Sequence, residues 1–130
     1  YQREARNDQG YAFLVFDLAG DHLVGGIALT NVQRGVTQSA SIGYWLGRSQ
    51  VGHGYMTDAV RSLVRFSFDT LHLHRLEAAT QPVNIASIRV LERSGFEREG
   101  YARQYLRIDG AWRDHVLFGL VARPGEGGGA

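Results

Sequence analysis

The hydrophobic positions in the first third of the chain fall into three short segments separated by polar and turn residues. Residues 11–18 (YAFLVFDL) are rich in aromatic and branched side chains, and the turn residues 19–21 follow them. Residues 22–31 return from that turn, and residues 41–46 (SIGYWL) form the third segment. Such segments are typical of β-strands, so we predict an antiparallel meander. The glycine pair 25–26 indicates a bulge or a close backbone approach.

The hydrophobic period changes to that of a helix after residue 55. Positions at the i, i+3, i+4 and i+7 spacing form one apolar helical face: Met56, Ala59, Val60, Leu63, Val64, Ser67, Phe68 and Leu71. Residues 75–80 then predict a short strand that ends before Pro82, because proline has no N–H to donate. A second helix follows, since Asn84 is a good N-cap and Gly95 supplies the left-handed position at its end.

Two further strands complete the pattern, over residues 96–108 and 112–121. The dipeptide Asp109-Gly110 between them is a strong signal for a tight hairpin turn. A chain of 130 residues has room for one domain, and we place that domain at residues 1–123. The glycine-rich segment 124–130 cannot pack, and we expect it to be disordered.

Composition and charge narrow the classes of function. Fourteen basic and thirteen acidic residues leave a net charge of +1, so no global field attracts nucleic acid or an anionic membrane. The absence of cysteine excludes disulfides, cysteine nucleophiles and thiolate metal sites. No segment resembles a membrane span or a signal peptide, and we expect a cytoplasmic protein. His72 and His74 have no third ligand nearby in the sequence, so we predict no metal site.

Glycines at the mouth of the first predicted helix are the strongest chemical signal. Gly52 and Gly54 allow the backbone to turn so that several N–H groups point outward at the positive end of the helix dipole, an arrangement that binds phosphate. A plain strand-to-helix turn has the same glycines. The dinucleotide fingerprint fails because Thr57 stands where the third glycine belongs, and the P-loop lysine is absent.

Three blocks together carry a family resemblance that covers almost the whole chain. They are IGYWLGRSQVGHGYMTDAV, RLEAATQPVNIASIRVLERSGFEREGY and YLRIDGAWRDHVLFGL. In this order and spacing they resemble the RimJ/RimL branch of the GNAT superfamily, which includes ribosomal-protein-alanine N-acetyltransferases. The resemblance implies an α+β fold: a mostly antiparallel twisted sheet, splayed at its centre and flanked by helices. It also implies acetyl-CoA as co-substrate.

The resemblance assigns the cofactor site to two segments. In the family, a loop wraps the CoA pyrophosphate with backbone amides, and the matching residues are Gln50, Val51, Gly52, His53, Gly54, Tyr55 and Met56. Ser49 departs from the Gln or Arg that many members have three residues before the first glycine. Trp45 and Leu46 match the end of the splayed strand, whose backbone pairs with the pantetheine amides.

Asn84 and Ser87 match the family's N-x-x-S at the start of the second helix. Asn84 has a structural role as an N-cap, and the resemblance adds a contact to the pantetheine arm. Ser87 would give a proton or a hydrogen bond to the departing CoA thiolate. The oxyanion would accept a hydrogen bond from a backbone N–H near Trp45 or Leu46.

The general base is open on the sequence alone. Glu77, Asp114, His115, Tyr44 and Tyr105 are candidates, and we nominate Glu77 and Tyr105 beside Ser87 as catalytic residues. Structural roles compete: Glu77 can pair with Arg75 or Arg89, and Asp114 with Arg113 or Arg107. An N-terminal α-amine has a pKa of about 8, so part of it is already neutral and water can serve as proton acceptor.

The acceptor is predicted to be a primary amine, above all the N-terminal α-amine of a ribosomal protein. Two alternatives stay open: a small amine such as an amino acid, polyamine or aminoglycoside, and a non-catalytic acyl-CoA-binding module. In the family, a strand and two helices form one wall of the acceptor site, and the ten residues before Tyr11 cannot supply them, so we expect this strand and these helices to be missing and the wall to be absent or much reduced. We expect the exposed apolar edge to favour self-association as a homodimer.

Overall fold

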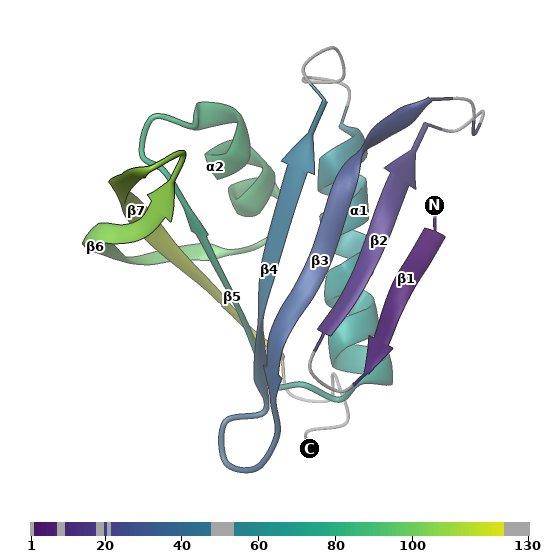
Figure 1. The fold of residues 1–130 in the computed structure, drawn as a ribbon. Coiled ribbons are helices and arrows are strands. Elements are labelled where there is room, and N and C mark those ends of the chain that lie inside the picture. Colours follow the sequence, from purple (N-terminus) through teal and green to yellow (C-terminus); the bar gives the residue numbers. More distant parts are fainter. Residues whose placement is uncertain (1, 8–9, 18–19, 21, 48–53, 124–130) are drawn as a thin grey trace.

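The computed structural model describes residues 2–7, 10–17, 20, 22–47 and 54–123, which form one twisted seven-stranded sheet with helices behind it (Figure 1). The strand order is β1-β2-β3-β4-β5-β7-β6. The strands are β1 (Gln2–Asn7), β2 (Gly10–Phe16), β3 (Leu23–Gln33), β4 (Ser39–Leu46), β5 (Arg75–Thr80), β6 (Glu97–Ile108) and β7 (Ala111–Val121). The helices are α1 (Tyr55–Arg65), which continues into the π-helical turn Phe66–Thr70, and α2 (Ile85–Arg93).

The predicted strands and helices are present in the predicted order. The hairpin turn between β6 and β7 is confirmed, because Asp109 and Gly110 have the positive φ values, 51° and 81°, of a mirror-image turn. The residues before Tyr11 form strand β1, contrary to the expectation that they supply no strand: its polar sequence carries no hydrophobic pattern, yet it pairs antiparallel with β2. The segment 124–130 lies outside the described residues, so its disorder stays a prediction.

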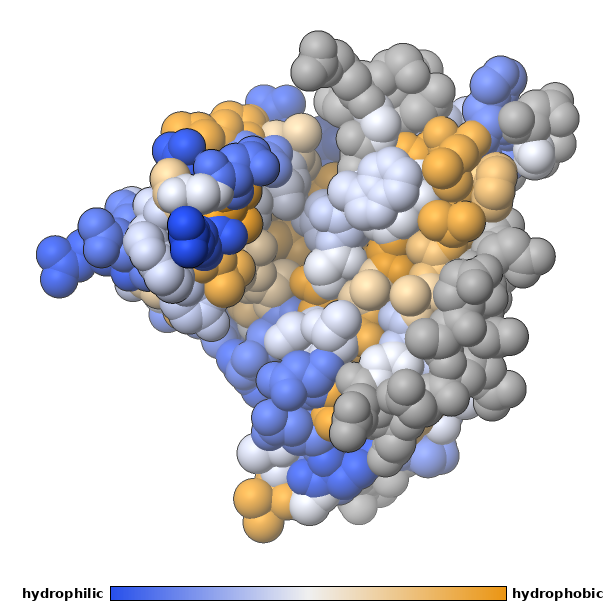
Figure 2. Space-filling view, viewed as in Figure 1, coloured by the Kyte–Doolittle hydropathy of each residue, from blue (hydrophilic) through white to orange (hydrophobic). Residues whose placement is uncertain are grey.

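The sheet is split between β4 and β5. These neighbours run parallel and pair only at their starts, where Ser39, Ala40 and Ser41 face Arg75, Leu76 and Glu77. Beyond these pairs the two strands diverge, so that β1 to β4 form one arm and β5 to β7 the other (Figure 1). Figure 2 shows the surface hollowed between the arms in the same view. The predicted splay at the centre of the sheet is therefore confirmed.

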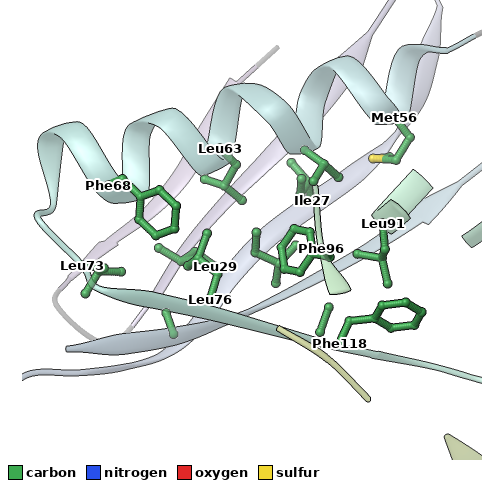
Figure 3. Close-up of a cluster of buried hydrophobic side chains, with 14 of the residues drawn as sticks. Ile27, Leu29, Met56, Leu63, Phe68, Leu73, Leu76, Leu91, Phe96 and Phe118 are labelled. Carbon is green, nitrogen blue, oxygen red and sulfur yellow. The ribbon is translucent and has the colours of Figure 1, made fainter. Parts of the chain in front are cut away.

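Both helices lie on the same face of the sheet and cover one continuous core. The buried face of α1, with Met56, Val60 and Leu63, packs toward residues of β3 and β5 such as Leu29 and Leu76 (Figure 3). Helix α2 adds Ile88 and Leu91 to the same cluster. Right-handed crossovers between parallel strands place successive helices on one side, which explains the shared face. No helix of the described residues covers the opposite face.

Candidate active site

The gap between the arms leaves one backbone edge of β4 without a strand beside it. Residues 42–46 keep their pairs with β3 but have no ladder partner in β5 among the described residues. Peptide groups along this edge can bind an extended ligand by completing the sheet. Trp45 and Leu46, predicted to contact pantetheine, lie at the open end of the gap.

Trp45 rests on a glycine of the neighbouring strand. Gly26 is paired with Trp45, and a Cβ atom added to Gly26 would lie 2.5 Å from the indole Nε1. The glycine therefore leaves room for the indole against β3, so the close neighbour at this position is a side chain and not the predicted backbone. Trp45 remains 54% exposed, on the face of the sheet that the helices leave open.

Helix α1 begins beside the open end of the gap. Its N-cap is Gly54, which has a left-handed backbone with φ 77° and no side-chain cap, so the first turn presents N–H groups that have no carbonyl one turn earlier. The side chain of Met56 is 1% exposed and belongs to the core. Of the predicted phosphate loop, Gln50, Val51, Gly52 and His53 lie outside the described residues.

A pair of hydroxyl groups connects the two arms. The hydroxyl of Tyr44 on β4 donates to the backbone oxygen of Ser87 at 3.0 Å and lies 2.9 Å from Ser87 Oγ. Burial raises the pKa of Tyr44 to about 12, although the hydrogen bond with Ser87 lowers it in part. Tyr44 therefore stays protonated near neutral pH. Asn84 caps α2 as predicted, since its side-chain oxygen accepts from the backbone N–H of Ser87 at 3.1 Å.

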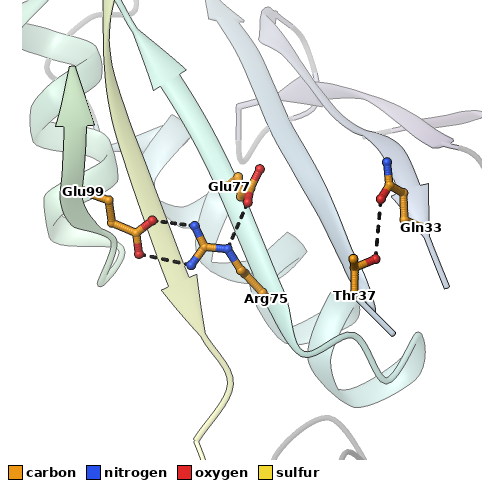
Figure 4. A network of polar contacts seen from close by, with 5 residues as sticks. All are labelled: Gln33, Thr37, Arg75, Glu77 and Glu99. Carbon is orange, nitrogen blue, oxygen red and sulfur yellow. Dashed lines mark hydrogen bonds and ion pairs between the residues drawn. The ribbon is translucent and has the colours of Figure 1, made fainter. Parts of the chain in front are cut away.

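Glu77 belongs to a charged network at the closed end of the gap (Figure 4). Arg75 donates through Nε to Glu77 at 2.9 Å, and its two other nitrogens bind both carboxylate oxygens of Glu99. The predicted pairing with Arg75 is confirmed. These hydrogen bonds raise the pKa of Arg75 and hold the pKa of Glu99 below its usual value. Glu77 and Ser87 lie on opposite faces of the sheet, and no hydrogen bond joins them.

Asp114 does not pair with Arg113 or Arg107, contrary to the prediction. Its Oδ2 accepts from the hydroxyl of Tyr101 at 2.6 Å, and its Oδ1 accepts from the backbone N–H of Gln104 at 2.9 Å. These two bonds lower the pKa of Asp114. The reason is a bulge, in which three residues of β6 stand opposite Asp114 and turn an N–H group toward its carboxylate.

Tyr105 of β6 and His115 of β7 lie together on the arm formed by β5 to β7. Their ring centroids are 5.9 Å apart at an interplanar angle of 58°. Tyr105 is 47% exposed, whereas His115 is 4% exposed. No hydrogen bond joins Tyr105 to Ser87 or Glu77, so the three nominated catalytic residues do not form one cluster. In the described part of the chain, no group of three metal-ligating side chains could hold a metal ion.

Comparison with known proteins identifies the family. Residues 1–97 match the model of the acetyltransferase (GNAT) domain family, and the chain therefore belongs to this family. Its members transfer the acetyl group of acetyl-CoA. The predicted RimJ/RimL-like, α+β GNAT fold is confirmed.

Individual relatives narrow the branch. The chain is 42% identical over 121 residues to the probable N-acetyltransferase YjcK of Bacillus subtilis (strain 168), with 93% of this chain and 67% of that protein covered. It is also 42% identical over 115 residues to the ribosomal protein uS5-alanine N-acetyltransferase of Escherichia coli (strain K12). That match covers 87% of this chain and 59% of the relative. The chain thus spans little more than half of the latter protein.

Solved structures agree with the sequence relatives. Mycobacterium smegmatis RimJ, solved in complex with CoA-disulfide, has a TM-score of 0.78 and 40% identity, covering 85% of this chain and 53% of that one. The ribosomal-protein-S5-alanine acetyltransferase of Vibrio fischeri has a TM-score of 0.81 and 35% identity, over 86% and 61% of the two chains. None of the described helices is long and apolar enough to cross a membrane.

Proposed function

We propose that this protein is an acetyl-CoA-dependent N-acetyltransferase that acts in the cytoplasm on the N-terminal α-amine of a protein, with ribosomal proteins as the first class to test. The observation that carries the proposal is the gap in the sheet, where β4 and β5 pair at three positions and then diverge beside the glycine-capped start of α1. Acetyl-CoA needs this combination, because it has a diphosphate at one end and an extended arm with two amides.

The cofactor would bind through main-chain groups. Backbone N–H groups of residues 50–56 would hold the diphosphate at the positive end of α1. The pantetheine arm would run along the free edge of β4 and pair with Trp45 and Leu46. Because Asn84 uses its side-chain oxygen for the cap, its Nδ2 is the group that would donate to a pantetheine carbonyl.

Catalysis would proceed by direct attack in a ternary complex. The neutral amine forms a bond to the thioester carbonyl carbon, and the oxyanion accepts a hydrogen bond from a backbone N–H near Trp45 or Leu46. The C–S bond then breaks, and the thiolate takes the proton of Ser87 Oγ. Tyr44, 2.9 Å from that oxygen, would support the transfer by turning its hydroxyl hydrogen from the Ser87 carbonyl oxygen to Oγ as the serine proton leaves. Glu77 and Tyr105 stay predictions for the proton acceptor.

The acceptor class rests on the relatives. The chain is 42% identical to a protein named for acetylation of a ribosomal-protein alanine, whereas the spermidine N-acetyltransferase structures are 21 to 22% identical and support the fold alone. We therefore propose a protein N-terminus as the acetyl acceptor and keep a polyamine as the second candidate.

Acceptor profiling tests the proposal. Release of CoA thiol would be followed with acetyl-CoA and peptides with N-terminal alanine or serine, the same peptides blocked at the α-amine, and spermidine. We expect turnover with the free peptides only. Turnover with spermidine alone would identify a small-amine enzyme, and binding of acetyl-CoA without turnover on any amine would identify a non-catalytic module.

A further inference from the structure

His115 lies on the open face of the β5–β7 arm. The next residue, Val116, is 2% exposed and belongs to the core beneath the helices with Phe118. Successive side chains of a strand point to opposite faces, so His115 points to the face that the helices leave open. With the proposed diphosphate site at the start of α1, on the helix side, the open face is the side that the described helices leave for an acceptor amine.

The position of His115 along the strand also matters. The last pair between β5 and β7 joins Thr80 to Val116, and His115 comes just beyond it, at the end where β5 leads into α2. Ser87 lies in the first turn of α2, at this same end. Glu77, in contrast, faces Ser41 in the last β4–β5 pair, at the closed end of the gap.

The tautomer of His115 follows from its one hydrogen bond. Nδ1 lies 3.0 Å from the carbonyl oxygen of Arg113. A carbonyl oxygen only accepts, so Nδ1 carries the hydrogen and Nε2 of the neutral ring keeps a lone pair. No buried side-chain nitrogen or oxygen of the described residues lacks a partner. Since Nε2 has no described hydrogen bond, it is the ring nitrogen that reaches solvent.

The β6 bulge positions the aromatic ring that lies beside His115. Gln104 has a positive φ of 47°, and the carboxylate of Asp114 holds its N–H group. The following residue, Tyr105, then lies against the imidazole. Asp114 is thus a positioning residue: it fixes the bulge that sets Tyr105 beside the imidazole of His115, a side chain that is 4% exposed and whose Nε2 has no described hydrogen bond.

We propose that His115 accepts the proton of the attacking amine through Nε2, directly or through one water, an inference that rests on the proposed acetyltransferase function. The amine nitrogen bonds to the carbonyl carbon and its proton moves to Nε2, which leaves a tetrahedral oxyanion and an imidazolium. The C–S bond breaks, Ser87 gives its proton to the thiolate, and the imidazolium returns one proton to Ser87 through solvent. The proton count therefore balances over one turnover.

The test compares His115→Asn and His115→Ala with the wild-type chain on the best acceptor peptide. Asparagine keeps a donor for the Arg113 carbonyl but has no Nε2. We expect both variants to lose about 100-fold or more in kcat, in the range of a general base, while the Kd for acetyl-CoA stays within about twofold. The exposed histidine His74 provides the matched control, and His74→Ala should leave kcat unchanged.

Chemical rescue separates a base from a packing residue. Imidazole added to His115→Ala should raise the kcat of that variant by about tenfold or more. Pyrazole, a ring of the same size and far weaker basicity, should not raise it. Equal rescue by both rings, or a His115→Asn variant within threefold of wild type, would overturn the proposal. So would a greater loss in Glu77→Gln or Tyr105→Phe than in His115→Asn. If the proposed acetyltransferase function itself were wrong, the result would differ, because the wild-type chain would then transfer no acetyl group.

Discussion

A charged contact crosses β7 on the open face of the sheet, and it occupies the space that a side chain at position 119 would take. Arg75 of β5 binds Glu99 of β6 over the intervening strand β7 (Figure 4). The Glu99 carboxylate lies against Gly119 of that strand. A Cβ atom at Gly119 would overlap the carboxylate of Glu99. We therefore predict that Gly119→Ala displaces Glu99 and breaks its ion pair with Arg75, while the strand itself is kept.

The magnitude follows from the exposure of the pair. The side chains of Arg75 and Glu99 are 28% and 40% exposed, so the ion pair contributes only about 0.5 to 1 kcal/mol to the free energy of unfolding. Alanine in a strand is more favourable than glycine by about 0.5 to 1 kcal/mol. In the wild-type background the two effects of Gly119→Ala nearly cancel. In a Glu99→Ala background only the gain remains, so the same substitution should stabilise the protein.

Urea unfolding of the four proteins of this double-mutant cycle provides the measurement. We expect Glu99→Ala to destabilise, Gly119→Ala to be close to neutral, and the double variant to be as stable as Gly119→Ala alone. Purely additive effects would refute the steric argument. The pKa of Glu99 is lowered in the folded state, so its contribution is present above the unfolded pKa and lost as pH falls through the folded pKa. The difference between wild type and Glu99→Ala should therefore vanish at acidic pH.

Three further predictions concern the proposed cofactor site. Gly54→Ala and Gly35→Ala place alanine at similar φ values, 77° and 72°, in open space, so both should lower the free energy of unfolding by about 1 kcal/mol. Only Gly54→Ala should weaken acetyl-CoA binding measured by calorimetry. Ser87→Ala should lower kcat at least tenfold, with Tyr44→Phe intermediate, and a loss below about threefold for Ser87→Ala would remove it from the mechanism. Asn84→Asp keeps the cap oxygen but loses Nδ2, so it should keep the melting temperature and lose acetyl-CoA affinity, whereas Asn84→Ala should lose both.

The sequence predicts the elements of this fold better than the contacts within its site. Hydrophobic period and turn residues place the meander, both helices and the final hairpin, because each of these signals is local. The two bulges of β6 are not local signals. Their extra residues, at Glu99 and opposite Asp114, depend on which residues of β7 stand across from them. Strict alternation therefore assigns faces incorrectly beyond each bulge, and the Arg75–Glu99 and Asp114–Gln104 contacts could not be predicted.

The hydrogen bond between Tyr44 and Ser87 depends on the separation of the two arms of the sheet. Tyr44 belongs to β4 and Ser87 to α2, so their hydroxyls come within 2.9 Å only at one separation of the two arms. A pantetheine arm bound along the free edge of β4 would lie between these arms of the sheet and would therefore act on that separation. The proposed proton donor is thus assembled by the same geometry that admits the cofactor. A substitution that closes or widens the gap should impair protonation of the thiolate even if it leaves every catalytic residue in place.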